Sequence, residues 1–211
     1  MPLYKSYKID HSTQLFVWKI TESLEELATG TALKDVCIDR MSGMRSEQHR
    51  KGFLSVRKLL ETAGYSDLDL YYGADGKPHL TDGKNITITH SYSFSAIIIS
   101  DRNIGVDMEI RREKVIKIAD KFLDREFEYL DPTHLEEYVR KLIVIWGVKE
   151  ALYKMFSQQG LSFKQNIEVH PFEMDDKKGT ATVSYMKIKG TYTFYFEEIE
   201  DFTLVYTLDN N

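Results

Sequence analysis

The sequence predicts an α+β fold, and both the order and the periodicity of its segments support this. Strand-like and helix-like segments occur in blocks, and the long βαβ alternation of a doubly wound sheet is missing. Apolar residues recur with a helical period through 46–61 and 135–156. From 167 to 208 they alternate as in strands. A division near residue 104 gives two halves of similar length.

Short patterns and chain breakers define the elements of the first half. Thr21 is expected to cap a short helix, and Gly64 to end a longer one. In chain order we expect a strand over 12–20, helices over 22–29 and 46–61, turns over 74–78 and 81–83, and strands over 86–89 and 95–99. This order again favours an α+β arrangement.

The second half is expected to begin with a strand and to continue with helices. The expected elements are a strand over 104–110, helices over 115–122 and 135–156, and strands between 167 and 208. The helix over 135–156 carries apolar residues on two opposite sides. It is therefore expected to be buried over most of its surface.

Composition limits the classes of function. The chain has 211 residues, of which 42% are apolar and 29% charged, as is usual for globular proteins. A net charge of −5 argues against a general nucleic-acid binder. No apolar stretch is long enough to span a membrane or to act as a signal peptide, and the single Cys37 leaves no internal disulfide. We therefore expect a cytoplasmic protein with no membrane or nucleic-acid partner.

One segment is basic in an acidic chain. Residues 40–58 hold six Lys and Arg side chains and one acid, Glu47. Such a segment fits an anionic ligand or partner, and it fits a solvated basic helix face equally well. The sequence leaves both interpretations open.

The strand expected over 104–110 carries two acids on one face. Because side chains alternate along a strand, Gly105, Asp107 and Glu109 share a face. Two carboxylates beside a glycine could hold a hard cation through oxygen. The alternative is a half-exposed strand with an acidic outer face.

The long helix changes character along its inward stripe. At about 100° per residue, the apolar stripe around Trp146 continues through Lys149, Glu150 and Lys154. Buried charges need partners or a ligand. A structural ion-pair cluster would satisfy them, but two lysines and one carboxylate suit a polyanion and a metal better.

A third segment, Thr89-His90-Ser91 at the end of a strand, offers groups that bind phosphate. No G-x-S-x-G elbow surrounds Ser91, and the chain has no Walker loop, no G-x-G-x-x-G and no Cys/His cluster for zinc. Carboxylates for Mg²⁺, together with lysines and a histidine for phosphates, predict phosphoryl-transfer chemistry without a P-loop.

These motifs, taken in order, resemble the 4′-phosphopantetheinyl transferases of the Sfp type. The run from Trp146 to Lys154, Trp-x-x-Lys-Glu-Ala-x-x-Lys, resembles the W/KEA branch. The motifs are Gly76-Lys77-Pro78, Ile88-Thr89-His90-Ser91, Gly105-Val106-Asp107-Met108-Glu109, Phe122 with Glu126, and Trp146-Gly147-Val148-Lys149-Glu150-Ala151-Leu152-Tyr153-Lys154.

The resemblance implies a pseudo-dimer of two similar α+β halves with the active site in the cleft between them. Residues 1–103 would contact the phosphates and adenine of coenzyme A, and 104–211 would provide the metal site and the carrier-protein docking surface. Mg²⁺ would be held by Asp107, Glu109 and Glu150. Met108 stands where some members carry a third acid.

The resemblance also implies the contacts with coenzyme A. Lys154 would contact the pyrophosphate, and His90 with Thr89 or Ser91 the phosphates. Thr89 replaces the serine that is frequent in this motif. Lys77 and Pro78 would border the adenine and the 3′-phosphate. Arg50 would bind the 3′-phosphate, with Arg45 and Arg57 as alternatives, and Lys149 would pair with a carboxylate.

The implied reaction transfers phosphopantetheine from coenzyme A to a serine of an apo acyl or peptidyl carrier protein, releasing adenosine 3′,5′-bisphosphate. Glu150, Lys154 and His90 would be the catalytic residues, and Glu150 or a nearby metal-bound water the base. A basic surface would dock the acidic carrier. It would include Arg111, Arg112, Lys114, Lys117 and Lys121, which fit a plain amphipathic helix equally well. A two-half chain is expected to be a monomer.

Two rival functions come from other classes. The first is a non-catalytic protein of the same fold that binds coenzyme A or a carrier protein, although such a protein would be expected to have lost the acids or Lys154. The second is an adaptor that uses the basic segment 40–58 and leaves the buried charges of the long helix unexplained. The carrier could belong to fatty-acid, polyketide or peptide synthesis.

Overall fold

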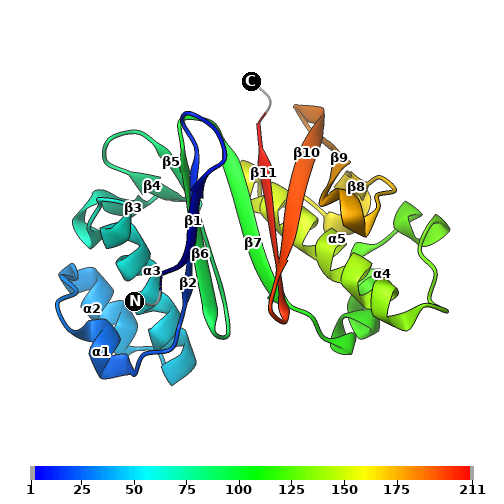
Figure 1. Ribbon diagram of the computed structural model, residues 1–211. Helices are drawn as coiled ribbons and strands as arrows, with labels where there is room; N and C mark the ends of the chain where they lie inside the picture. Colours follow the sequence, from blue (N-terminus) through cyan, green and yellow to red (C-terminus); the bar gives the residue numbers. More distant parts are fainter. Residues whose placement is uncertain (1–2, 210–211) are drawn as a thin grey trace. The chain divides into compact units, whose positions relative to one another are not determined.

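The computed structural model describes residues 3–209, and the chain divides into two compact units, Met1–Arg102 and Asn103–Asn211. Each unit combines one antiparallel sheet with helices (Figure 1). The α+β class predicted from the sequence is confirmed. The boundary expected from the sequence fell between residues 103 and 104. The binding roles assigned to the two halves stay predictions.

The N-terminal unit is built on a six-stranded antiparallel sheet in the order β1-β2-β6-β5-β4-β3. The strands are β1 (Leu3–Lys8), β2 (Gln14–Lys19), β3 (Leu70–Tyr72), β4 (Pro78–Leu80), β5 (Asn85–Ser91) and β6 (Phe94–Ser100). All seven residues of β6 are buried, which explains its nearly continuous apolar run. The short strands β1, β3 and β4 lie at or near the sheet edges, and the sequence patterns did not predict them.

Helix α3 (Glu47–Thr62) covers this sheet, contacting β2, β5 and β6. Ser46 caps it, and Gly64 has a φ of 87°, as expected for a residue that ends a helix. Helix α1 (Leu24–Ala28) is capped by Ser23, whose side chain accepts from the Glu26 amide. The predicted Thr21 cap was therefore wrong, because Ser23 forms a complete capping box with Glu26. Two further elements, α2 (Asp35–Ser42) and the 3₁₀ turn Asp67–Asp69, were not predicted.

The C-terminal unit has a five-stranded antiparallel sheet in the order β7-β11-β10-β9-β8. Its strands are β7 (Ile104–Ile110), β8 (Ile167–Val169), β9 (Lys178–Tyr185), β10 (Ile188–Ile199) and β11 (Phe202–Leu208). Strand β11 is buried along its whole length between β7 and β10. The strands expected over 104–110 and between 167 and 208 are confirmed.

Helix α5 (Leu135–Phe156) packs across β7 and β11 (Figure 1). Leu142, Val148 and Leu152 are fully buried in the core of this unit. The predicted bounds of this helix are confirmed. The helix expected over 115–122 is a 3₁₀ segment, Glu113–Ile118, followed by one α-helical turn, α4 (Ala119–Phe122). A second 3₁₀ segment (Arg125–Glu128) and α6 (Phe163–Asn166) lie beside α5 and β8, and a third (Met174–Asp176) precedes β9.

Within residues 3–209, none of the helices combines the length and the apolar character needed to cross a membrane.

Candidate functional site

Helix α5 approaches the sheet closely at two glycines, at Gly105 of β7 and where its own Gly147 faces β11. A β-carbon on Gly105 would lie 1.8 Å from the carbonyl oxygen of Ala151, and one on Gly147 would lie 2.7 Å from Cγ2 of Val205. A larger residue at either position would have to push the two elements apart. The close approach places Asp107 and Glu109, which share the face of Gly105, directly under the helix.

Asp107 is buried and bonded to Lys154 of α5. Its side chain is 6% exposed, and Lys154 Nζ lies 2.7 Å from Oδ1. The same ammonium group donates to the carbonyl of Val106 at 3.0 Å. Because the Lys154 side chain remains 29% exposed, this ion pair is reachable from solvent. The partner that the sequence required for Lys154 is therefore a carboxylate of β7.

Glu109 and Glu150 carry raised pKa values for the same reasons. Burial, followed by the charge of Asp107, raises the pKa of Glu109 to about 7, although the indole of Trp146 donates to Oε1 at 3.3 Å and opposes the shift. Burial and the charge of Asp107 also raise the pKa of Glu150, against the opposing effect of Lys154. Three carboxylates thus lie close enough to repel one another, and a bound cation would relieve that repulsion.

These acids are not already arranged as a metal site. In the part of the chain that the structure describes, no three His, Cys, Asp or Glu side chains are gathered in a geometry that could hold a metal ion. Lys154 holds one oxygen of Asp107, and Trp146 holds one oxygen of Glu109. The charge and the oxygen chemistry of the donor set fit Mg²⁺. The assignment of Asp107, Glu109 and Glu150 as ligands stays a prediction.

Lys149 lies on another side of α5 and is fully buried in an ion pair with Glu126. Its Nζ lies 2.6 Å from Oε1 of Glu126, and it also donates to the carbonyls of Phe122, Phe163 and Ile167 at 2.7, 3.0 and 2.8 Å. Burial alone would raise the pKa of Glu126, but Lys149 and the amides of Asp124 and Val169 together lower it. The expected pairing of Lys149 with a carboxylate is confirmed, and this lysine ties α5 to the loops on either side of it.

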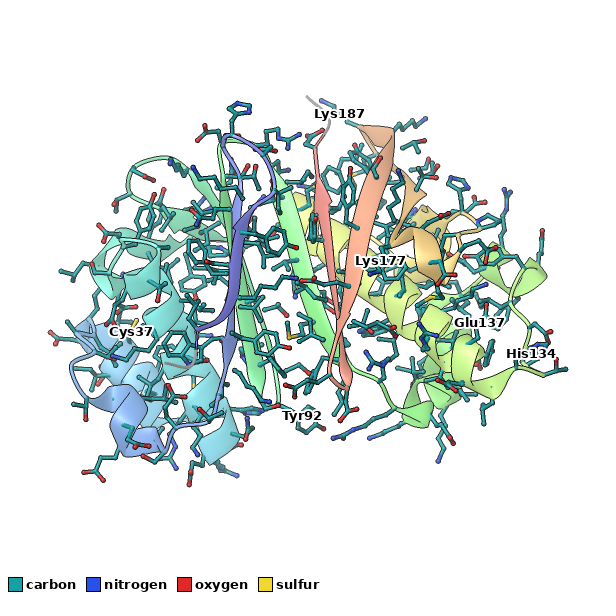
Figure 2. All side chains as sticks on the ribbon, in the orientation of Figure 1. Cys37, Tyr92, His134, Glu137, Lys177 and Lys187 are labelled. Carbon is teal, nitrogen blue, oxygen red and sulfur yellow. The ribbon has the colours of Figure 1, made fainter. Side chains whose placement is uncertain are left out.

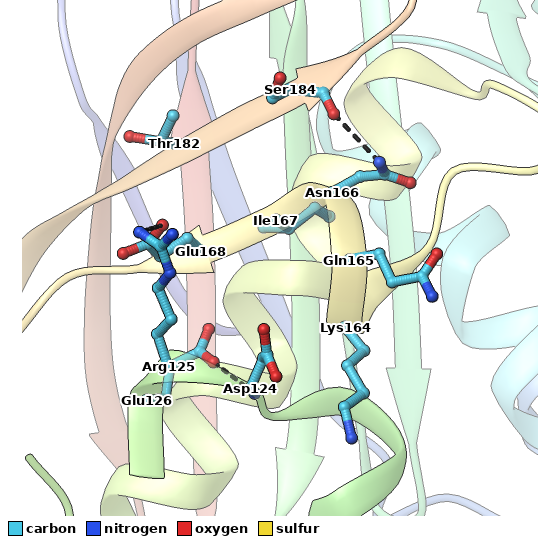
Figure 3. A pocket seen from close by; sticks show the side chains of 10 residues that line it. All are labelled: Asp124, Arg125, Glu126, Lys164, Gln165, Asn166, Ile167, Glu168, Thr182 and Ser184. Atoms are coloured by element: carbon cyan, nitrogen blue, oxygen red, sulfur yellow. Dashed lines mark hydrogen bonds and ion pairs between the residues drawn. The ribbon is translucent and has the colours of Figure 1, made fainter. Parts of the chain in front are cut away.

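Glu126 also lines a polar cavity of about 180 Å³ (Figure 3). Arg125 reaches Glu168 at 3.4 Å across it, and Asn166 Nδ2 donates to the carbonyl of Ser184 at 3.0 Å. The cavity is lined by Asp124, Arg125, Glu126, Lys164, Gln165, Asn166, Ile167, Glu168, Thr182 and Ser184. Since these residues include neither the acids of β7 nor Lys154, the cavity is separate from the acidic cluster.

In the N-terminal unit, α3 meets the end of β5 at His90. A β-carbon on Gly52 would lie 3.1 Å from Nδ1 of His90, so the glycine makes room for the imidazole. Arg50 lies one half-turn earlier on α3, and its Nε is buried without a hydrogen-bond partner within residues 3–209. A buried guanidinium nitrogen in this state favours an anionic ligand beside it.

The predicted phosphate donors on β5 and before β4 do not all lie on one face of the sheet. Alternation along β5 puts His90 on one face of the sheet and Thr89 and Ser91 on the other. All three can therefore approach a single ligand only at the end of the strand. Lys77 lies in the turn before β4 and Pro78 begins that strand, and the amide of Lys77 donates to Oδ1 of Asp75 at 3.1 Å. Burial lowers the pKa of Lys77.

The two alternative arginines differ from Arg50. Arg57 is 3% exposed and pairs with Asp67, with Nε 2.9 Å from Oδ1. It also lies over the ring of Phe53 and near Sγ of Cys37, the residue labelled among the helices of this unit in Figure 2. Arg57 is therefore already paired, which makes it a weaker alternative than Arg50, and the choice between them stays a prediction. Arg45 is exposed in the turn before α3.

The basic residues of the expected docking surface also differ in whether they are already paired. Arg111 donates to the carbonyls of Glu200 and Phe202 and lies 3.6 Å from Glu198, so it secures the turn between β10 and β11. The remaining basic residues of the set are exposed: Arg112, Lys114, Lys117 and Lys121. The expected role of Arg111 in docking is therefore not supported by its contacts.

Sequence reasoning assigned no role to three residues of this site. Trp146 was used as a motif residue, but its bond to Glu109 was not predicted. Gly147 faces Val205, and its need for close packing could have been suspected from a glycine inside an apolar helix. Thr203 of β11 lies directly opposite Glu109. Nothing in the local sequence signals this pairing, because it joins residues that are far apart in the chain.

Comparison with known proteins adds two findings. Residues 103–207 match the model of a family described as the 4′-phosphopantetheinyl transferase superfamily. The chain is also 29% identical over 142 residues to the 4′-phosphopantetheinyl transferase gsp of Aneurinibacillus migulanus. That alignment covers 65% of this chain and 57% of the length of the relative.

Proposed function

We propose that this chain, whose residues 103–207 match the model of the 4′-phosphopantetheinyl transferase superfamily, is an Mg²⁺-dependent 4′-phosphopantetheinyl transferase of the Sfp type and the W/KEA branch. The relative from Aneurinibacillus migulanus supports the activity. The observation that carries the proposal is the cluster of three mutually repelling carboxylates beside the reachable Lys154 on β7 and α5. A scaffold without chemistry would have no need to keep these charges together.

The acidic cluster is the proposed Mg²⁺ site. Asp107, Glu109 and Glu150 would hold the ion, since their oxygen atoms are the ligands that this cation prefers. When bound, Mg²⁺ would neutralise the charge of the coenzyme A pyrophosphate. Lys154 lies at the edge of the cluster, and it would leave Asp107 to contact a pyrophosphate oxygen.

The proposed chemistry is a displacement at phosphorus. The serine hydroxyl of an apo carrier protein attacks the phosphorus that bears the pantetheine arm, and the bond to the bridging oxygen breaks. Adenosine 3′,5′-bisphosphate leaves, and the serine proton passes to Glu150, either directly or through a water. Burial and the charge of Asp107 raise the pKa of Glu150 in the metal-free protein, and a bound cation would oppose this shift.

The N-terminal unit would bind the rest of coenzyme A. Arg50 would bind the 3′-phosphate, which supplies the acceptor that its buried Nε needs. His90 would contact the phosphates together with Thr89 or Ser91, and Lys77 with Pro78 would border the adenine. In this proposal residues 1–103 contact the phosphates and adenine of coenzyme A, residues 104–211 provide the metal site, and the protein acts as a monomer.

The direct test incubates the protein with coenzyme A, Mg²⁺ and several apo carrier proteins, and follows carrier mass. We expect a gain of one phosphopantetheine group. Asp107→Ala should abolish this gain, and Asp176→Asn, an exposed acid outside the cluster, should leave it unchanged.

The rival function is a non-catalytic protein that binds coenzyme A or a carrier. Calorimetric binding of coenzyme A by the wild type, without transfer to any carrier, would favour this rival and refute the proposed activity.

A further inference from the structure

Thr203 of β11 is a buried polar residue whose hydroxyl is not satisfied. Its side chain belongs to a residue that is 1% exposed, and Oγ1 has no hydrogen-bond partner among residues 3–209. Burying a hydroxyl without a hydrogen bond is destabilising. Valine has nearly the same shape and no such penalty, and it is the residue found two positions later on the same face, at Val205. The threonine therefore needs an explanation.

The pairing of strands places Thr203 between two glutamates. It lies opposite Glu109 of β7 and opposite Glu198 of β10. Directly paired residues of antiparallel strands project from the same face, so the three side chains form a row across the sheet. This row lies on the face under α5, because Val205 and Asp107 of the same face contact Gly147.

Within residues 3–209, Glu198 has strong donors and Glu109 has none. Arg140 binds Glu198 with both Nε and Nη2, at 2.9 and 2.7 Å, and Arg111 adds an ion pair at 3.6 Å. Glu109 receives one hydrogen bond, at 3.3 Å, from Trp146 to Oε1. An acceptor for the Thr203 hydroxyl is therefore available at Glu109.

We propose that Thr203 is a positioning residue for the transfer reaction. Its hydroxyl donates a hydrogen bond to the carboxylate of Glu109 when coenzyme A and Mg²⁺ are bound. The inference rests on the proposed function. Glu109 would then be held on one side by Trp146 and on the other by Thr203, which fixes its orientation toward Asp107 and Glu150. The unsatisfied hydroxyl of the free protein is the cost of a donor kept ready for the bound state.

Three variants test this inference, and the two threonine-to-valine changes keep the buried volume nearly constant. Thr203→Val removes the unsatisfied hydroxyl, and Thr203→Ser keeps a hydroxyl. Thr207→Val is the matched control, since Thr207 lies on the same face of β11, is fully buried, and donates to the carbonyl of Thr193 at 3.0 Å. Thr207 lies opposite Gly105, and no catalytic or binding role is assigned to it.

We expect stability and activity to move in opposite directions in Thr203→Val. Without ligands its unfolding temperature should rise by about 2–4 °C, while kcat/KM for transfer falls about 10-fold or more. Its KM for Mg²⁺ should rise, and the Mg²⁺-dependent increase in unfolding temperature with coenzyme A present should shrink. Thr203→Ser should keep transfer within a few-fold of the wild type. Thr207→Val should lose stability and keep its rate.

A purely structural role for Thr203 gives a different result. If Thr203→Val unfolds at a lower temperature, as expected of Thr207→Val, the hydroxyl is satisfied in the native protein and the inference is overturned. It is also overturned if Thr203→Val transfers at the wild-type rate with an unchanged response to Mg²⁺. A wild type that shows no transfer refutes the proposed function instead, and the two failures are therefore distinguishable.

Discussion

Two lysines five residues apart on α5 form ion pairs of different kinds. Lys149 is fully buried, and its ammonium group meets Glu126 and three backbone carbonyls. Lys154 is partly exposed, and its ammonium group meets Asp107 and one carbonyl. Both lysines belong to one short motif, yet their surroundings differ in exposure and in the number of acceptors.

The difference separates a structural charge from a charge available for chemistry. Lys149 has no capacity left for a ligand, and it holds α5 against the loops around Phe122 and Phe163. Lys154 lies beside acids that repel one another, and because its ammonium group is partly exposed it remains accessible to an anion. The chemical use of a lysine in such a motif therefore depends on its burial.

The largest expected effect is the loss of stability in Lys149→Met. Removing the lysine leaves Glu126 buried and unpaired, which should cost about 3–5 kcal/mol of unfolding free energy. Urea unfolding measures this cost. The double variant Lys149→Met with Glu126→Gln should recover part of it. A cost below about 1 kcal/mol would show that the two ion pairs are alike.

Lys154→Met should show the reverse pattern. Its loss of unfolding free energy should be smaller than that of Lys149→Met, because the Lys154 ammonium group is partly exposed, although Asp107 stays buried. Its rate of transfer should fall about 100- to 1,000-fold, since a donor to the charge that develops on the phosphate is lost. Steady-state kinetics at saturating coenzyme A provides the measurement. A rate within a few-fold of the wild type would contradict the assigned role.

The close packing of α5 on the sheet at Gly105 and Gly147 can be disrupted without changing either ion pair. Gly105→Ala would place a methyl group against the Ala151 carbonyl, and should cost about 3 kcal/mol or somewhat more. Gly147→Ala meets side-chain atoms of Val205 and Asp107 and no backbone atom, and should cost less. Thermal unfolding of the two variants gives the order. Equal costs would mean that β7 adjusts more easily than its contacts suggest.

The buried pair Arg57–Asp67 of the N-terminal unit provides a second structural ion pair, whose contribution to stability should depend on pH. Burial alone would raise the pKa of Asp67, but the Lys34 amide, the Cys37 thiol and Arg57 together lower it. A carboxyl with a lowered native pKa stabilises above its unfolded pKa of about 3.9, and this stability is lost as pH falls through the native value.

Asp67→Asn should therefore cost about 1.5–3 kcal/mol at pH 7, and the cost should shrink below about pH 4. Urea unfolding of both proteins between pH 7 and pH 3 tests this. A difference that stays constant with pH would show that the charge of Asp67 does not contribute.

The period of the apolar residues was sufficient to predict an element where those residues form its buried face. The bounds of α5 and the strand over 104–110 were predicted, because their apolar residues repeat with the period of the element. Strands β3 and β4 and helix α2 were missed, since they are short and their order depends on neighbours in the sheet and core. At α1, two hydroxyl residues competed for the cap, and the box with Glu26 favoured Ser23 over Thr21.

For the candidate site, too, local patterns predicted some features, and contacts between distant residues were not predictable. Strand alternation placed Asp107 and Glu109 on one face, and helical spacing showed that Lys149, Glu150 and Lys154 needed partners. Neither pattern could show that Lys149 pairs with Glu126, that Trp146 donates to Glu109, or that Arg57 is already occupied by Asp67. Each of these contacts joins residues at least ten positions apart.

The amino-acid sequence by itself determined the α+β class, the buried helix and the residue types available for phosphate and metal chemistry, because these follow from local periodicity and side-chain chemistry. Only the tertiary structure decided which charges are already paired and which can still bind a ligand. The physical reason is that burial and pairing depend on long-range packing, as the opposite environments of Lys149 and Lys154 on a single helix demonstrate.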